Sequence, residues 1–234
     1  MRFLFVFAHP DDETFSSGGT IAKLTSAKHK VKLITATRGE VGQPGTPPIT
    51  TMEELPKVRE QELRRAAKIL GISEIFFLGF IDGKLRYARN ENLENKILSI
   101  FKKEKPDVIV TFDKTGASNH PDHKAIGRAA TNAFFKYKDL VNKHVKLYHT
   151  AMPRSFVKQF EKQGLDYSAF GKILGTADKD ITTLVNIEKA LNIKIKALKE
   201  HKTQNHDWER FLKRIEKSQF NYEFFKLIHE KEIF

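Results

Sequence analysis

Short apolar runs and stretches of helical periodicity alternate along the first 150 residues of the chain. The run RFLFVF at 2–7 predicts a buried strand, because it is short, apolar and followed closely by His9-Pro10. Similar apolar runs predict further strands at 31–36, 75–80, 107–112 and about 145–151. Apolar residues at helical spacing predict helices at 14–28, 53–70, 91–104 and 121–137. This alternation indicates an α/β fold: a Rossmann-like, mostly parallel sheet with helices on both faces.

The C-terminal third carries weaker patterns of the same kind. They predict helices at 153–163, 188–201 and 206–217, and strands at 181–185 and 220–228. The aromatic residues Phe220, Phe224 and Phe225 fit a core or a subunit interface better than a ligand site, so a homo-oligomer stays open. No linker, repeat or low-complexity segment interrupts the chain, which indicates a single domain over 1–234. The segment 39–51 is rich in Gly, Pro and Thr and predicts a long, functional loop.

The composition excludes several classes of protein. The chain contains no Cys, which excludes disulfides, thiolate zinc sites, iron–sulfur clusters and a Cys nucleophile. It contains no run of about 18 apolar residues, so no membrane span is expected. The first residues lack a small-residue cleavage site and do not resemble a signal peptide, so we expect a cytoplasmic location.

The chain is strongly basic, with a formal net charge of +12 and a pI of about 9.7. Such a charge can reflect a surface that binds nucleic acid. The Lys residues are scattered along the predicted helices, however, and no Lys/Arg run interleaved with aromatic residues is present. We therefore expect a solvated, Lys-rich surface and no nucleic-acid partner.

Two polar clusters follow two of the predicted strands. AHPDDE at 8–13 comes after the first strand, and SNHPDH at 118–123 comes after the fourth. In an open α/β sheet, ligands bind at the carboxyl ends of the strands, where the strand order reverses. With the strand order 3-2-1-4-5, the first and fourth strands are neighbours at that point. The two clusters are therefore expected to face each other across a crevice.

The residue types in these clusters suit a catalytic metal. His9 and Asp12 lie three residues apart on a tight turn, and His123 can approach from the opposite cluster. Catalytic zinc sites keep three such ligands and a water, although two His and one Asp also accept manganese, iron or cobalt. The remaining polar residues, Asp11, His120 and Asp122, form a surplus that resembles an acid/base set more than a structural site. No GxGxxG motif follows the first strand, so no dinucleotide cofactor is expected.

These paired motifs resemble those of the LmbE-like zinc de-N-acetylases, also called the GlcNAc-phosphatidylinositol de-N-acetylase (PIG-L) type. Further segments resemble the family in the same order along residues 1–205: TRGEVG (37–42), VREQELRRAAKILG (58–71), FIDGKL (80–85) and KIKALKEHKTQ (194–204). The resemblance implies a zinc-dependent hydrolase. Its expected partner is a small N-acetylated, sugar-like substrate such as an N-acetylglucosamine derivative, from which acetate and a free amine are formed.

The resemblance also implies a role for each matching residue. Three would hold the metal: His9, Asp12 and His123. Three would act in catalysis: Asp11 as the general base, His120 as stabiliser of the oxyanion, and Asp122 as the residue that tunes the charge of His120. Three would contact sugar hydroxyls away from the metal cluster: Glu40, Arg59 and Asp82. Where some relatives carry a Tyr before HPDH, this chain has Ala117, Ser118 and Asn119.

Simpler interpretations stay open for several of these residues. Asp11 could cap a helix, and Asp122 could favour the dipole of the helix that it begins. Glu40 and Arg59 could form a structural ion pair, and Asp82 before a Gly is typical of a turn. His201 with Gln204 could be the exposed end of a helix.

Two alternative functions also stay open. One is a metal amidohydrolase that acts on a non-sugar amide. The other is a basic nucleic-acid-binding protein with an inactive metal site. Asp11 and His120 argue against the latter, because a binding module does not need them.

Overall fold

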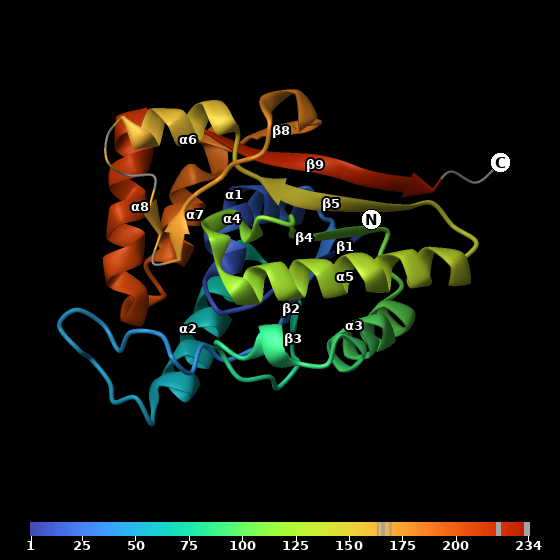
Figure 1. Ribbon diagram of the computed structural model, residues 1–234, viewed down its shortest axis with the longest axis horizontal. Helices are drawn as coiled ribbons and strands as arrows, with labels where there is room; N and C mark the ends of the chain where they lie inside the picture. Colours follow the sequence, from blue (N-terminus) through green and yellow to red (C-terminus); the bar gives the residue numbers. More distant parts are fainter. Residues whose placement is uncertain (163, 165–166, 169, 219–220, 232–234) are drawn as a thin grey trace.

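An open mixed sheet with seven strands forms the centre of the described chain, which comprises residues 1–162, 164, 167–168, 170–218 and 221–231 of this computed structural model (Figure 1). The strand order is β3-β2-β1-β4-β5-β9-β8. The parallel strands are β1 (Arg2–Phe7), β2 (Lys30–Thr35), β3 (Glu74–Phe77), β4 (Val108–Phe112) and β5 (Val145–Ala151). The antiparallel strands beyond β5 are β9 (Tyr222–Lys231) and β8 (Thr183–Asn186). A separate short ribbon pairs β6 (Tyr167–Ser168) with β7 (Gly171–Lys172).

Helices cover both faces of the sheet. In Figure 1, α3 and α5 lie in front of the strands and pack against each other, whereas α1 lies behind them and packs against α2 and α7. The α-helices are α1 (Asp12–Ser26), α2 (Leu55–Leu70), α3 (Asn90–Glu104), α4 (Gly116–Asn119), α5 (Pro121–Leu140), α6 (Arg154–Glu161), α7 (Leu191–Leu198) and α8 (Asn205–Ser218). The 3₁₀ helices are η1 (Leu85–Tyr87), η2 (Asp178–Asp180), η3 (Glu188–Ala190) and η4 (Lys202–Gln204).

The core lies on both faces of the central strands β1 and β4. Phe5 and Phe7 are fully buried, and their neighbours along β1, which point to the opposite face of the sheet, are buried as well. Both faces of the strand are buried because helices cover both sides of the sheet. This double burial explains why the predicted strands appear as continuous apolar runs rather than as an alternating pattern. Phe112 at the end of β4 stacks on His123 with a centroid distance of 4.2 Å, so the core extends directly under a candidate site residue.

Two close approaches of helix backbone place the functional turns. Gly127 on α5 lies so near β4 that an added Cβ would be 2.5 Å from the Phe112 carbonyl oxygen. Gly19 on α1 likewise lies against Ile187, only 2.6 Å from the position of an added Cβ. These glycines let α5 rest on the end of β4 and let the C-terminal elements pack on α1.

The predicted fold class and the order 3-2-1-4-5 of the first five strands are confirmed. The C-terminal strand β9 runs antiparallel to its neighbours β5 and β8, and the sequence patterns did not predict this direction. Phe224 and Phe225 are buried, as expected for core residues, whereas Phe220 lies outside the described residues. The segment 188–201 forms η3 followed by the shorter α7 rather than one helix. A single domain over 1–234 stays a prediction.

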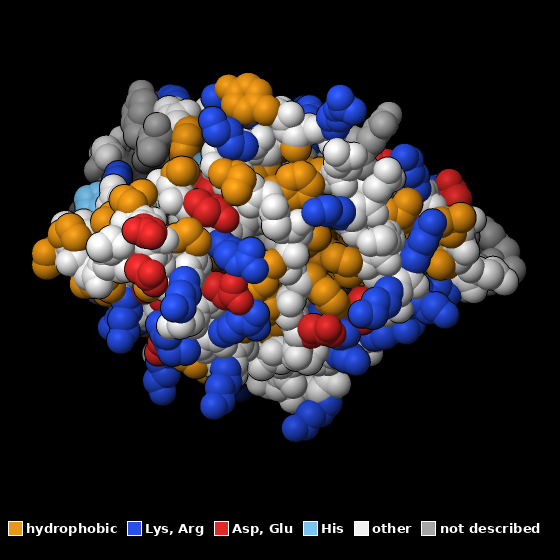
Figure 2. Space-filling view, turned by 90° about the horizontal axis from the view of Figure 1, so that it is seen from below, with side chains coloured by type: hydrophobic (Ala, Val, Ile, Leu, Met, Phe, Trp, Pro, Cys, Tyr) orange, Lys and Arg blue, Asp and Glu red, His pale blue; other side chains and the backbone are white. Residues whose placement is uncertain are grey.

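Charged side chains are dispersed over the face of the molecule drawn in Figure 2. Figure 2 shows a face on which Lys and Arg alternate with acidic and apolar side chains rather than forming one basic patch. This distribution agrees with a solvated, Lys-rich surface. Among the described residues, no helix is both long and apolar enough to cross a membrane.

The half-buried His149 on β5 should make stability depend on pH. Burial lowers the pKa of His149 from 6.5 to about 4, and its Nε2 lies 2.9 Å from the Thr131 hydroxyl. Between these two pKa values the unfolded chain binds a proton that the folded chain does not, so the free energy of unfolding falls as the pH falls from 6.5 towards 4. Urea unfolding across this pH range should show that His149→Gln loses less free energy of unfolding than the wild type does. Equal losses would contradict the assignment.

Candidate metal centre and active site

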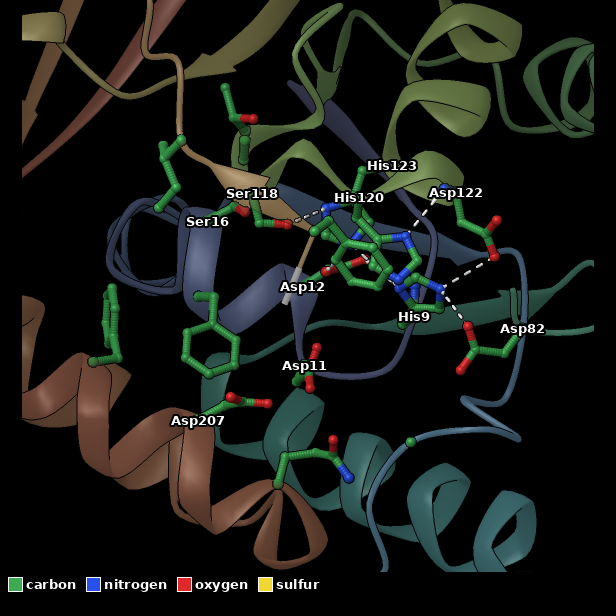
Figure 3. Close-up of a pocket in the computed structure, with 18 of the residues that line it drawn as sticks. His9, Asp11, Asp12, Ser16, Asp82, Ser118, His120, Asp122, His123 and Asp207 are labelled. Atoms are coloured by element: carbon green, nitrogen blue, oxygen red, sulfur yellow. Dashed lines mark hydrogen bonds and ion pairs between the residues drawn. The ribbon is translucent and has the colours of Figure 1, made fainter. Parts of the chain in front are cut away.

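A cavity of about 900 Å³ opens at the carboxyl ends of β1 and β4. These strands are parallel neighbours, so the turns that follow them meet at the same edge of the sheet. The structure brings together all six residues of the two predicted clusters at this cavity: His9, Asp11, Asp12, His120, Asp122 and His123. Figure 3 shows their side chains converging from opposite sides of the crevice.

Three side chains in the cavity are arranged as metal ligands. The Nε2 atom of His123 lies 3.2 Å from Nδ1 of His9 and 3.0 Å from Oδ1 of Asp12. The ligand atoms of these three buried residues all lie within 4.8 Å of one another. Asp12 also closes its own turn, because its Oδ2 accepts the backbone N–H groups of Ala8 and His9 at 3.1 and 2.8 Å. The spacing of three residues between His9 and Asp12 thus serves both the turn and the site.

The outer ring nitrogens of both His residues face oxygen atoms. His123 Nδ1 lies 3.0 Å from the Gly116 carbonyl oxygen, and His9 Nε2 lies 2.8 Å from Oδ1 of Asp82. These contacts place a hydrogen on the outer nitrogens and leave the lone pairs of the inner nitrogens directed at the shared point. In a second group, His9, His120 and Asp122, the ligand atoms also lie within 4.8 Å of one another, but the His9 nitrogen that faces Asp122 is Nε2, which Asp82 already engages. The first set is therefore the better fit to a cation.

The charges around His9 also favour a bound cation. Burial alone would lower the pKa of His9, but contacts with Asp122 and Asp82 raise it to about 10. For Asp12, the interactions with His123 and His9 outweigh the effect of burial and hold its pKa well below the usual range. Buried carboxylates that draw a proton onto a neighbouring imidazole need positive charge at this point, which a divalent metal ion supplies.

Asp11 lies beside this set but belongs to a separate group. Its backbone is left-handed, with φ of 100°, and its Oδ2 lies 3.1 Å from Nη2 of Arg59. Burial raises the pKa of Asp11 to about 7 against the opposing charge of Arg59, with a further contribution from Asp12. The alternative that Asp11 caps α1 through its side chain is wrong, because that side chain makes no capping hydrogen bond.

His120 is held by the start of α5. Its Nδ1 accepts the Asp122 backbone N–H at 3.1 Å, so a neutral ring carries its hydrogen on Nε2. Burial, together with the nearby His123 and His9, lowers the pKa of His120 from 6.5 to about 4. A neutral imidazole at this position is an N–H donor within the cavity.

The carboxylate of Asp122 acts on two imidazoles, the expected His120 and also His9. Asp122 is fully buried, and its Oδ2 accepts the Gly83 N–H at 2.7 Å and lies 3.5 Å from Nε2 of His9. The carboxylate therefore contacts His9 directly, whereas it acts on His120 through its charge, which opposes the lowering of the His120 pKa.

The residues expected to contact sugar away from the metal lie closer to it than predicted. Arg59 is 3% exposed, and its Nη2 donates to the Pro10 carbonyl oxygen at 2.6 Å as well as to Asp11. Asp82 contacts the candidate ligand His9 directly. The expected separation is therefore wrong for Arg59 and Asp82.

Glu40 does not pair with Arg59, so the ion pair considered as an alternative is also wrong. Instead, Glu40 accepts the backbone N–H groups of Arg38 and Asp82, at 3.1 and 3.0 Å, and supports the turn after β3. Its carboxylate holds the two loops on one side of the cavity together.

The C-terminal segments contribute His201 and Gln204, and also Asp207, which the sequence did not single out. His201 is fully buried and lies 3.1 Å from Glu13, so the alternative of an exposed helix end is wrong. Gln204 lines the cavity and donates to the Gln43 carbonyl oxygen at 2.8 Å. Helix α8 forms one wall, where Asp207 faces the cavity (Figure 3). Amphipathic spacing predicted that helix but did not indicate which face would meet the cavity.

Metal content should separate the ligands from the residue that orients them. His123→Ala should lose most of its bound divalent metal, because it removes one of three ligands. Asp82→Ala should weaken metal affinity about 10-fold to 100-fold, since it releases the outer nitrogen of His9. Elemental analysis and metal titration measure both effects, with His229→Ala as a control outside the cavity. An Asp82→Ala variant that keeps full metal affinity and only raises KM would assign Asp82 to the substrate instead.

Comparison with known proteins agrees with this geometry. Residues 4–134 match the family model described as PIG-L: GlcNAc-PI de-N-acetylase. The 1D-myo-inositol 2-acetamido-2-deoxy-alpha-D-glucopyranoside deacetylase of Saccharomonospora viridis is 31% identical over 230 residues, which covers 86% of this chain and 84% of that protein.

Two solved structures share the fold at low sequence identity. The N,N'-diacetylchitobiose deacetylase of Pyrococcus horikoshii gives a TM-score of 0.71 at 22% identity, over 97% of this chain and 83% of that one. The 4-carboxy-2-hydroxymuconate hydratase GalB of Pseudomonas putida also gives 0.71, at 15% identity, over 99% and 97% of the two chains. The fold alone therefore does not specify the reaction. The family match and the full-length relative do specify it, and the chain belongs to the PIG-L family of metal-dependent N-deacetylases.

Proposed function

We propose that this protein hydrolyses the N-acetyl group of an N-acetylglucosamine derivative, with zinc as its metal, to give acetate and a free amine. The observation that carries the proposal is the separation of two functions within one buried cluster. His9, Asp12 and His123 converge on one point, while the adjacent Asp11 keeps a carboxylate of its own at the cavity. A hydrolase needs such a free base next to its metal, and a metal-binding module does not.

His9, Asp12 and His123 would hold the metal. Two imidazole nitrogens and one carboxylate oxygen form the donor set of many catalytic zinc sites. A divalent ion bound there supplies Lewis-acid polarisation of the amide carbonyl and lowers the pKa of water. Asp82 and Asp122 orient the ring of His9 through its outer nitrogen, at 2.8 and 3.5 Å.

Asp11 and His120 would carry out the proton transfer and the stabilisation of charge. With a pKa near 7, Asp11 is suited to accept the proton of the attacking water and to return it to the departing amine nitrogen. His120 would donate its Nε2–H to the carbonyl oxygen as negative charge develops there. A neutral His120 can fill this role because it needs only an N–H group.

The cavity has room for more than a single acetylated sugar. Its volume of about 900 Å³ is near the upper end of the range for small-molecule sites. Half-buried aromatic rings line it beyond the metal cluster, where Phe15 and Phe211 pack edge to face with centroids 5.2 Å apart. We therefore propose a substrate that carries a further ring or chain on its N-acetylglucosamine unit. A cytoplasmic location and a homo-oligomer stay predictions.

Release of acetate from a small substrate series tests the proposed function. The series is free N-acetylglucosamine, its myo-inositol glycoside and N,N'-diacetylchitobiose, assayed with metal-stripped protein and after addition of zinc. We expect activity to depend on the metal, and kcat/KM to be higher for the two larger compounds because they fill more of the cavity. Absence of acetate from all three would contradict the function. Equal kcat/KM for all three would contradict only the proposed extension of the substrate.

The adjacent carboxylates Asp11 and Asp12 should respond differently to the same substitution. Asp11→Asn should keep its metal and lose activity by about 10²-fold to 10⁴-fold, because it removes the proton acceptor without changing the shape. Asp12→Asn should weaken metal binding, and added zinc should restore part of its activity. A metal titration followed by acetate release compares them. If added zinc restored the activity of Asp11→Asn instead, Asp11 would be the metal ligand and Asp12 the base.

A further inference from the structure

Two buried residues near Asp11, Glu13 and His201, do not line the cavity. We infer that His201 and Glu13 form a buried positioning pair that holds Asp11 in its working orientation. The inference rests on the proposed deacetylation, because Asp11 is the base of that reaction. It gives a function to His201, which is fully buried but belongs to neither group of candidate metal ligands.

The backbone of Asp11 needs such support. Its φ of 100° and ψ of −29° fall in a region that residues with a Cβ rarely adopt. Such a conformation costs free energy and persists only where the surrounding contacts impose it. The conformation follows directly after the turn that carries His9, so it sets where the Asp11 carboxylate lies relative to the ligands.

Glu13 supplies the contact to the strained residue. Its Oε2 accepts the Asp11 backbone N–H at 3.1 Å, and its Oε1 lies 3.1 Å from Nε2 of His201 and also accepts the Thr14 hydroxyl. Glu13 and His201 are both 0% exposed. One carboxylate therefore joins the catalytic turn to a residue 188 positions further along the chain.

The opposite end of Asp11 is held by Arg59. Its guanidinium donates to the Asp11 carboxylate at 3.1 Å and to the carbonyl oxygens of Pro10 and Gly39 at 2.6 and 3.2 Å. Glu13 thus holds the main chain of Asp11 while Arg59 holds its side chain. Arg59 lines the cavity, whereas neither Glu13 nor His201 is among the lining residues, so these two can act on the reaction only through Asp11.

His201 is itself held in place by its contacts. Burial alone would lower its pKa, but the Glu13 carboxylate raises it, so the ring carries a hydrogen on the nitrogen that faces Glu13. The next turn is held to α2, because the backbone N–H and hydroxyl of Thr203 both donate to Glu62, at 2.9 and 2.6 Å. The end of α7 is therefore a rigid support rather than a frayed terminus.

Substitution of His201 tests the inference. His201→Phe should lower kcat about 10-fold to 100-fold, the usual effect of removing a residue that orients an active group, with KM and bound metal unchanged. His201→Gln should recover most of kcat, because its amide can donate to Glu13. His229→Phe replaces a partly buried His outside the cavity and should leave kcat unchanged. A His201→Phe enzyme with wild-type kcat, or with a changed KM alone, would overturn the inference.

A double-mutant comparison distinguishes positioning from general damage. If His201 acts through the Asp11 carboxylate, His201→Phe should cause little further loss of kcat in an Asp11→Asn background. Full additivity of the two losses would overturn the inference. Wild-type protein that releases no acetate would instead contradict the proposed function, so the two failures are distinct.

Glu13→Asp provides a test that is independent of enzymatic activity and does not require that a His201 variant folds. It keeps the negative charge but shortens the side chain by one methylene, so the carboxylate cannot reach both Asp11 and His201. The Asp11 amide hydrogen should exchange at least about 10-fold faster than in the wild type, since it loses its acceptor. Unchanged exchange at Asp11 would overturn the inference whatever the kinetics show.

Discussion

The parallel pairing of β1 with β4 is the constraint on which the candidate site depends. These strands lie side by side in the middle of the sheet, so the turns that follow Phe7 and Phe112 open at the same edge. One turn contributes His9 and Asp12, and the other contributes His123. Because Phe112 stacks under His123 and a glycine brings α5 onto the end of β4, the distance between the turns is set by core packing. A change in that packing would act on the ligand geometry directly.

The second constraint is the charge that the site concentrates away from water. Asp12, Asp82 and Asp122 all lie close to His9 and are almost fully buried. Buried carboxylates without compensation are costly, and those around His9 raise its pKa and so favour a proton on its ring. A divalent cation would satisfy the same demand and would leave Asp11, which Arg59 and Glu13 hold from two sides, as the proposed base. In this proposal, different residues bind the metal and supply the base.

The sequence predicted the parts of this arrangement that are local. Apolar runs gave the parallel strands and their order, and the two motifs at 8–13 and 118–123 gave all six residues that the structure brings together. Long-range polar contacts were not predictable. Nothing in the spacing of Arg59 shows that it reaches the Pro10 carbonyl oxygen, or that Asp122 turns to His9. The direction of β9 and the burial of His201 likewise depend on how the C-terminal segment packs on α1, which its own weak periodicity does not encode.

The division of the chain has a consequence for specificity. The family match ends at residue 134, and this part contains the proposed ligands, Asp11 and His120. The remaining part supplies the α8 wall with Asp207 and Phe211, and it supplies His201 behind Asp11. The residues proposed for the chemistry therefore come from the first part, while the second part supplies one wall of the same cavity. A shared fold can then serve a hydratase as well as deacetylases, because the sheet fixes only where the turns meet, and the side chains on those turns decide the reaction.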